Sequence, residues 1–230
     1  MIKDYNDFCT ELLKAGFSLA HGNNENVFGL IEYGWNEEPS DSPIRWHTGD
    51  RDRDPWEWRI RVLNERDDVA YAKVFFCKAG YITKECYPYF LAARRCGKSF
   101  MDEYLDGNIS NYAKRIYEVI SENGSLPLHE IKQIARFKRE DNSKFDRALT
   151  ELQMKLYITM CGEQQKISKK GESYGWSSMV FCTTESFWGE EVFKQAQKIS
   201  QEEAVQAIRE RVYTLNPLAQ EKKVIKFING

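Results

Sequence analysis

The stretch SNYAKRIYEVISENG, residues 110–124, opens the part of the chain that decides the fold. Ser110 is a typical helix N-cap, and Ala113, Ile116 and Ile120 recur at the three- and four-residue spacing of one helical face. Asn123-Gly124 is a typical helix end. Two shorter helices are expected over 126–135 and 141–154, and a hairpin follows, in which a strand near 156–161 turns at Gly162 and can pair with the stretch up to Ser168. Residues 175–184 supply another strand. Three helices followed by a hairpin is the order of a winged helix-turn-helix.

The first half of the chain has a mixed pattern that predicts an α+β module. Apolar spacing indicates a helix over 5–15, and VFGLIEY (27–33) is typical of a short strand. A long loop rich in Pro, Gly, Asp and Ser follows over 34–54, and Asp54 with Pro55 is expected to begin a helix. A strand is expected over 69–76, and then a helical stretch from Thr83 to Arg95 with a kink at Pro88.

These patterns predict the fold class and the division of the chain. We expect an α+β protein with three parts: an α+β module over 1–107, a winged helix-turn-helix over 108–185, and C-terminal helices that pack on the rest over 186–230. In the last part, Ser200 and Glu203 have the spacing of a capping box.

Composition and charge argue against a disordered, polycationic, membrane-spanning or secreted protein. With 42% hydrophobic residues in a chain of 230, the protein has enough apolar side chains for a core, and a net charge of −2 excludes a general polycation. No apolar run is long enough to span a membrane, and the charged N-terminus does not resemble a signal peptide. The six cysteines lie at least nine positions apart, which favours free thiols and a cytoplasmic location. We expect no metal and no cofactor, because no ligand or nucleotide-binding motif is present.

The helix expected over 141–154 carries the best candidate for a binding site. If Phe145, Leu149 and Leu152 face the core, Ser143, Arg147 and Thr150 lie on the opposite face, with Lys144 beside them. Arginine and hydroxyl side chains on an exposed helix can contact duplex DNA in the major groove. Between residues 132 and 170 there are ten basic and five acidic residues, an excess of five positive charges. The predicted DNA contacts are Lys138, Arg139, Ser143, Lys144, Arg147, Thr150, Lys166, Lys169 and Lys170.

The same observations allow other interpretations. A charged outer face is what any solvated helix shows, and Glu151 on the proposed contact face repels phosphate. Winged helices also serve as protein-interaction modules, and KKVIKFI (222–228) is a candidate contact for a protein partner or a second copy of the chain. We expect no membrane partner.

A second candidate surface is the stretch IRWHTGDRDRDPWEWRIR, residues 44–61. Aromatic rings interleaved with arginines can stack on bases and pair with phosphates, and carboxylates beside a histidine can do acid–base chemistry. The simpler interpretation is that Arg–Asp pairs fold this loop onto an aromatic core, because the acids nearly cancel the arginines. The residues of this possible second surface are Trp46, His47, Arg51, Arg53, Asp54, Trp56 and Arg59.

The segment from PWEWR to YPYFLAARR (55–95), followed by the helices and hairpin of 111–182, resembles the AlkZ-related proteins. These are similar to the AlkZ/YcaQ winged-helix superfamily of bacterial DNA glycosylases, and the resemblance spans about residues 27–216. It implies contact with duplex DNA and, for the true glycosylases, excision of alkylated or crosslinked bases.

Two departures from the family pattern weaken the case for catalysis. The true glycosylases stack several winged helices, whereas this chain has clear room for one. They also position water with a Gln-x-Gln or Gln-x-Asp pair in the N-terminal region, but here Gln195-Ala196-Gln197 lies late in the chain. We therefore predict no catalytic residue and favour a non-catalytic DNA-binding or DNA-repair protein. A glycosylase or nucleotide-processing enzyme that uses Asp50, Asp52, Asp54 and Glu57 remains the alternative.

Overall fold

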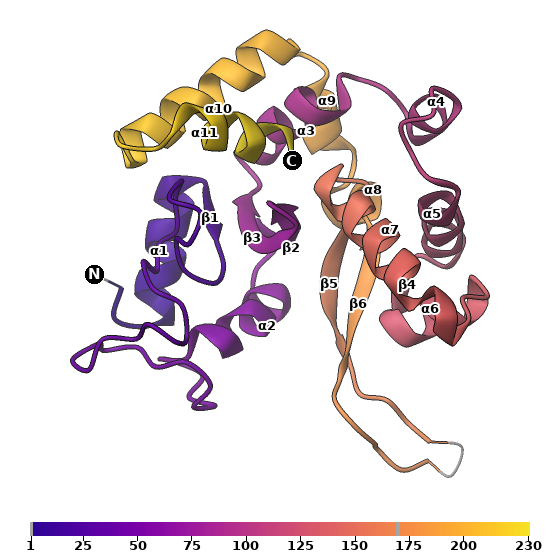
Figure 1. Cartoon of the computed structure of the whole chain (residues 1–230), viewed down its shortest axis with the longest axis horizontal. Coiled ribbons are helices and arrows are strands. Elements are labelled where there is room, and N and C mark those ends of the chain that lie inside the picture. Colours follow the sequence, from indigo (N-terminus) through magenta and orange to yellow (C-terminus); the bar gives the residue numbers. More distant parts are fainter. Residues whose placement is uncertain (1, 169–170) are drawn as a thin grey trace. The chain divides into compact units, whose positions relative to one another are not determined.

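The structure, a computed structural model, describes residues 2–168 and 171–230 (Figure 1). The chain divides into two units, one comprising Met1–Gly97 with Glu190–Gly230 and the other Lys98–Gly189. We call them unit 1 and unit 2. Each combines helices with antiparallel strands, so the predicted α+β class is confirmed.

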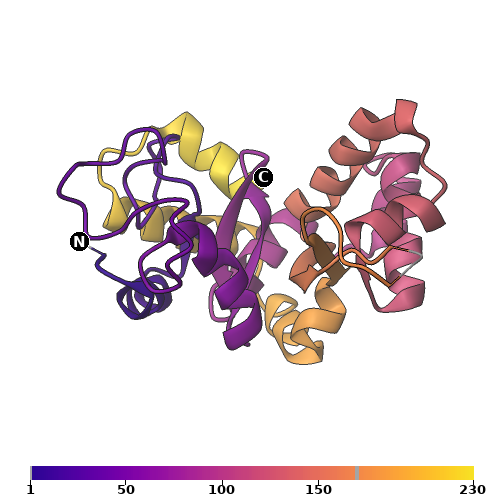
Figure 2. The ribbon, with the colours of Figure 1, turned by 90° about the horizontal axis from the view of Figure 1, so that it is seen from below.

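Unit 1 is built from both ends of the chain. Its strand β3 lies between β1 and β2 and is antiparallel to both. Helix α3 packs against the three C-terminal helices, two of which are the yellow ribbons in Figure 2. The elements of unit 1 are α1 (Tyr5–Ala15), β1 (Phe17–Leu19), α2 (Pro55–Glu65), β2 (Val69–Phe75), β3 (Lys78–Thr83), α3 (Tyr87–Arg95), α9 (Glu190–Ala196), α10 (Gln201–Leu215) and α11 (Glu221–Asn229).

Aromatic side chains fill the core of unit 1. The rings of Phe75 and Phe227 stack with their centroids 3.9 Å apart, and Phe17 and Phe90 contact both of them. Gly80 in β3 makes this packing possible, because a Cβ atom at that position would lie 2.4 Å from the ring of Phe75. Helix α11 is thereby joined to the sheet by an interior aromatic contact.

Arg94 holds the end of helix α11 in place. Its guanidinium donates hydrogen bonds to the carbonyl oxygens of Ile228 (2.7 Å) and Phe227 (2.8 Å), and also to that of Val74 in β2 (2.8 Å). Burial lowers the pKa of Arg94. The last carbonyl groups of a helix lack partners within the helix, so this arginine supplies the donors that they need.

The strand predicted over 27–33 is wrong. This segment has no regular secondary structure, although Val27 and Ile31 are buried. The chain runs beside β1, where the Leu19 amide donates to the Phe28 carbonyl oxygen (3.1 Å). The next contact is different, because the Leu30 amide donates to the Ser18 hydroxyl (3.0 Å) rather than to a backbone carbonyl. Val27 and Ile31 therefore pack into the core although the segment that carries them is a loop.

The helical stretch predicted over 83–95 is shorter than expected and has a different start. Thr83 is the last residue of β3, and helix α3 begins at Tyr87, which places Pro88 in its first turn. In that position the missing amide hydrogen of proline costs no helical hydrogen bond. Pro88 thus starts the helix instead of kinking it.

Unit 2 contains the three helices that we predicted over 110–154, but the predicted turn at Gly162 and return strand up to Ser168 are wrong. Strand β5 (Ile158–Gln164) continues through Gly162 and pairs with β6 (Ser178–Thr183) instead, because the register shift between Met160 and Gly162 lets the ladder continue past the glycine. Its strand β6 lies between β5 and β4 and is antiparallel to both. Between β5 and β6, the described residues 165–168 and 171–177 extend beyond helices α6 and α7 (Figure 1). The elements are α4 (Phe100–Leu105), α5 (Asn111–Asn123), β4 (Ser125–Pro127), α6 (Leu128–Ile134), the 3-10 turn η1 (Arg139–Asp141), α7 (Asn142–Met154), β5 (Ile158–Gln164), β6 (Ser178–Thr183) and α8 (Thr184–Trp188).

The predicted helix signals in unit 2 are confirmed. The Ser110 hydroxyl accepts a hydrogen bond from the amide of Ala113, which caps helix α5. The apolar stripes point inward: Ile116, Ile120, Phe145 and Leu152 are fully buried. Their burial fixes which faces of α5 and α7 remain exposed to solvent.

Candidate nucleic-acid interface

The outward face of helix α7 carries the predicted polar residues. Ser143, Lys144 and Arg147 are exposed, and Thr150 is half-buried. They lie opposite the buried stripe of α7, as the 100° rotation per residue requires. Lys138 and Arg139, which come just before the helix, are exposed as well. The fold of unit 2 therefore brings six of the nine predicted DNA contacts to α7 and the turn before it.

The cations on this surface differ in their partners. Lys144 forms an ion pair with Asp141 (2.9 Å), and the hydrogen bond between them raises the pKa of Lys144. Lys138 lies 3.9 Å from a carboxylate oxygen of Glu140. Within residues 2–168 and 171–230, the guanidinium groups of Arg139 and Arg147 contact no carboxylate. Exposed ion pairs are weak and screened by salt, so all four cations are open to phosphate, the two arginines most of all.

Glu151, which we expected to oppose DNA binding, has a structural role. Its carboxylate accepts hydrogen bonds from the amide (3.0 Å) and the hydroxyl (2.8 Å) of Ser110, the N-cap residue of helix α5. A carboxylate at a helix N-terminus is stabilised by the helix dipole. The negative charge of Glu151 thus stabilises the N-terminus of helix α5.

The hairpin loop between β5 and β6 carries side chains that the sequence analysis missed. Ile167, Tyr174 and Trp176 are exposed, with 89% of the surface of Trp176 accessible. Of the three lysines predicted to contact DNA from this loop, Lys166 is half-buried. Lys169 and Lys170 lie outside the described residues. The segment GESYGWSS (171–178) has the Gly and Ser content of a surface loop, and this composition indicates that its aromatic residues are exposed. A search for helical or strand periodicity does not detect such residues.

The second candidate surface, in unit 1, contains an aromatic cluster. The guanidinium of Arg59 lies 3.8 Å from the ring centroid of Trp56, and the ring of His47 lies 5.0 Å from it. His21, which the sequence analysis missed, packs against both Trp46 and Trp56 at 6.1 Å. Burial lowers the pKa of His21, and the nearby Arg59 and His47 lower it further.

Two residues predicted for the second surface are not exposed. Trp46 is 7% exposed, and Asp54 is completely buried. The Asp54 carboxylate accepts hydrogen bonds from the amides of His47 (3.1 Å), Thr48 (2.7 Å) and Gly49 (2.9 Å). It also accepts one from the amide of Trp56 (2.8 Å), in the first turn of α2. Asp54 therefore organises the loop and caps a helix, and neither role requires contact with a ligand.

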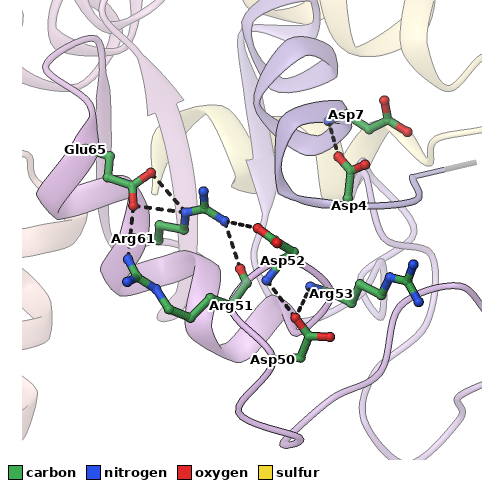
Figure 3. Close-up of polar contacts among 8 residues, drawn as sticks. All are labelled: Asp4, Asp7, Asp50, Arg51, Asp52, Arg53, Arg61 and Glu65. Carbon is green, nitrogen blue, oxygen red and sulfur yellow. Dashed lines mark hydrogen bonds and ion pairs between the residues drawn. The ribbon is translucent and has the colours of Figure 1, made fainter.

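The charged residues of this loop pair with one another (Figure 3). Arg61 donates to Asp52 (2.6 Å) and to Glu65 (2.9 Å), and Arg51 donates to Glu65 (3.1 Å). Arg53 is exposed, and among the described residues no side chain pairs with its guanidinium. The pattern agrees with the simpler interpretation, in which Arg–carboxylate pairs hold the loop in place.

Other site chemistry is limited in the described residues. Among them, no three His, Cys, Asp or Glu side chains form a group that could hold a metal ion. The described helices include none with the length and apolar character to cross a membrane. Gln195 and Gln197 are exposed, and the Gln195 amide donates to Glu191 (3.1 Å) on the same helix.

Comparison with known proteins assigns the chain to a family. The model of the family described as AlkZ related matches residues 2–229, almost the entire sequence. Neither a curated protein nor a solved structure matches the chain. Since the family match covers both units, the chain belongs to the AlkZ-related family.

Proposed function

We propose that this protein is a non-catalytic, DNA-repair-associated protein that binds duplex DNA through a winged helix in unit 2. Membership of the AlkZ-related family supports an association with DNA repair. The element order α5, β4, α6, α7, β5, β6, with β4 and β5 on either side of β6, supports the winged-helix assignment. The division into domains 1–107, 108–185 and 186–230 and the cytoplasmic location stay predictions.

One observation carries the proposal. Arg139 and Arg147 are exposed beside the N-terminal half of α7, and no carboxylate within the described residues neutralises them. Ser143 lies one helical turn before Arg147 on the same face. A helix that presents arginine and hydroxyl groups in this way matches the contacts that position a recognition helix on phosphates and base edges.

The hairpin loop supplies the second part of the proposed surface. Lys166 adds a positive charge, and Trp176 adds an exposed aromatic face that can pack on nucleic acid. The loop of residues 44–61 contributes less, because most of its charges are already paired and Asp54 is buried. In unit 1, Arg53 is the best remaining candidate for a phosphate contact.

The same pairing disfavours the enzymatic alternative. A general acid or base needs a carboxylate that can reach the substrate. Asp54 is completely buried and enclosed by backbone amides, so it lacks that reach and serves the structure of the loop instead. Asp52 is paired with Arg61 but its side chain is 73% exposed, so the cleavage test decides whether it has a chemical role.

The test measures binding and chemistry in the same samples. The purified protein is titrated into a fluorescent duplex at several salt concentrations, with a second duplex that carries an alkylated base, and each mixture is checked for strand cleavage after alkaline treatment. Salt-sensitive binding to both duplexes without cleavage is the expected result. Cleavage of the alkylated duplex would refute the non-catalytic assignment, and a lack of binding at low salt would refute the DNA-binding function.

A further inference from the structure

A small cavity in unit 1 belongs to neither of the surfaces described above. It lies between the end of α1 with the start of β1, the start of α3 and the middle of α10, and its volume is about 250 Å³. Cavities that bind drug-sized molecules typically measure about 300–1,000 Å³, so this one has room for a somewhat smaller molecule. All of its lining residues belong to unit 1, so the cavity is formed within that unit.

The inner wall of the cavity is apolar. Phe17, Phe90 and Ile208 line it, and all three are buried. Gly16 lines it as well, and a Cβ atom at that position would lie 2.3 Å from the sulfur of Cys86, so this part of the wall has no room for a side chain at residue 16. Apolar atoms of a ligand placed against these side chains would be removed from water, which favours binding.

Arg211 adds a positive charge to the lining of the cavity. Its Nε atom donates a hydrogen bond to the carbonyl oxygen of Ala15 (3.0 Å), and a terminal nitrogen donates to that of Lys14. Within residues 2–168 and 171–230, its guanidinium pairs with no carboxylate. A guanidinium has five N–H donors, so these two bonds leave others for a ligand.

The other polar groups of the lining restrict the charge of the ligand. The Lys14 ammonium pairs with Glu11 (2.8 Å), so this lysine adds little positive charge. Glu85 is exposed and repels anions. Burial raises the pKa of Cys86, so its thiol stays neutral near pH 7. A ligand with a single negative charge therefore fits the lining better than a phosphate monoester, whose charge is about −1.5 to −2.

We propose that this cavity binds a small carboxylic acid with an apolar body, of the kind represented by a medium-chain fatty acid. The carboxylate accepts hydrogen bonds from Arg211, and the apolar chain lies against Phe17, Phe90 and Ile208. The planar guanidinium matches the geometry of a carboxylate, and charge-assisted hydrogen bonds of this type are stronger than neutral ones. The site lies in unit 1 and does not depend on DNA binding through unit 2, so the two proposals can fail separately.

The experiment is equilibrium dialysis of the full-length protein against radiolabelled octanoate at neutral pH. We expect one octanoate per chain, with a dissociation constant of about 1 mM or lower. Unlabelled 1-octanol, which has the same chain without the charge, serves as the competitor. It should bind at least about tenfold more weakly than octanoate, because it lacks the charged hydrogen bonds to Arg211.

Variants in α10 locate the site. Arg211→Gln should weaken octanoate binding at least about tenfold. The matched control Arg209→Gln removes the same charge from the same helix, but Arg209 pairs with Glu221 and does not line this cavity, so octanoate binding should stay unchanged. Ala207→Trp places a larger side chain in the lining and should also reduce binding.

Three results would overturn the proposal. The first is a failure of the wild-type protein to bind octanoate at about 10 mM. The second is equal binding of octanol and octanoate, and the third is an unchanged affinity for octanoate in folded Arg211→Gln, with folding checked by circular dichroism. If Arg211→Gln does not fold, the comparison of octanol with octanoate on the unmutated chain decides the question.

Discussion

Asp54 offers the sharpest test of whether the 44–61 loop is structural. We consider the variant Asp54→Asn, which keeps the size of the side chain and removes its charge. Asparagine is about as good a helix N-cap as aspartate. If capping of α2 were the only role of Asp54, the variant would therefore lose almost no stability.

The contacts of the carboxylate predict a large loss instead. One oxygen accepts from the amides of His47 and Trp56, and the other accepts from the amides of Thr48 and Gly49. The side-chain amide of asparagine has one acceptor oxygen, so its NH2 group must face two of these four N–H donors. Each buried donor left without an acceptor costs about 1–3 kcal/mol, which gives a loss of roughly 2–6 kcal/mol for the two.

The measurement is urea-induced unfolding followed by tryptophan fluorescence, with Asp50→Asn as the matched control. Asp50 is exposed and accepts from the amides of Asp52 and Arg53 near the protein surface, so its variant should lose less than about 1 kcal/mol. A loss below about 1 kcal/mol for Asp54→Asn would show that the loop does not depend on this carboxylate, and the structural account of the loop would be wrong.

Three further predictions concern single side chains. Trp176→Ala should leave stability unchanged, since the ring is 89% exposed, but should weaken binding to duplex DNA by about fivefold in a fluorescence titration. Arg94→Met should destabilise the protein by about 3 kcal/mol in urea unfolding and speed hydrogen exchange in residues 221–229, because three carbonyl groups lose a charged donor. Burial raises the pKa of Tyr71 to about 12, so ionisation favours the unfolded chain once the pH exceeds 10. From pH 8 to pH 11 this linkage should remove about 1.4 kcal/mol from the wild-type protein, and Tyr71→Phe should lose correspondingly less.

Sequence periodicity was enough to predict α5, α6 and α7 of unit 2, but not the short helices α4 and α8. In α5 and α7 the apolar residues recur with the helical period, and each helix has one buried face, so the exposed faces followed directly. The period of the apolar stripe therefore predicts that Ser143, Lys144 and Arg147 are exposed, as the structure confirms. Periodicity does not predict which charged or polar side chains on different helices contact one another. The contact between Glu151 and Ser110 spans 41 positions and depends on how α7 packs against α5.

The first half of the chain was harder to predict because its short segments lack a period. VFGLIEY has the composition of a strand, but β1 is the three-residue segment Phe17–Leu19, which is too short to give a sequence signal. The sequence predicts that arginines of the loop pair with carboxylates, but not that Arg61 pairs with Asp52 and Glu65. The acids and arginines of the loop balance in number, but only the fold decides which of them meet.

The most direct test of the account is the salt dependence of DNA binding in a double variant, Arg139→Ala with Arg147→Ala. Counting Lys138, Arg139, Lys144, Arg147 and Lys166 as phosphate contacts, log K of the wild-type protein should fall with log salt at a slope of about −4.5. The double variant should bind more weakly, with a slope less steep by about 1.8. A charge-matched control, Lys194→Ala with Lys198→Ala in unit 1, should leave the slope unchanged. If the double variant kept the wild-type affinity and slope, the outward face of α7 would not be the DNA-binding surface.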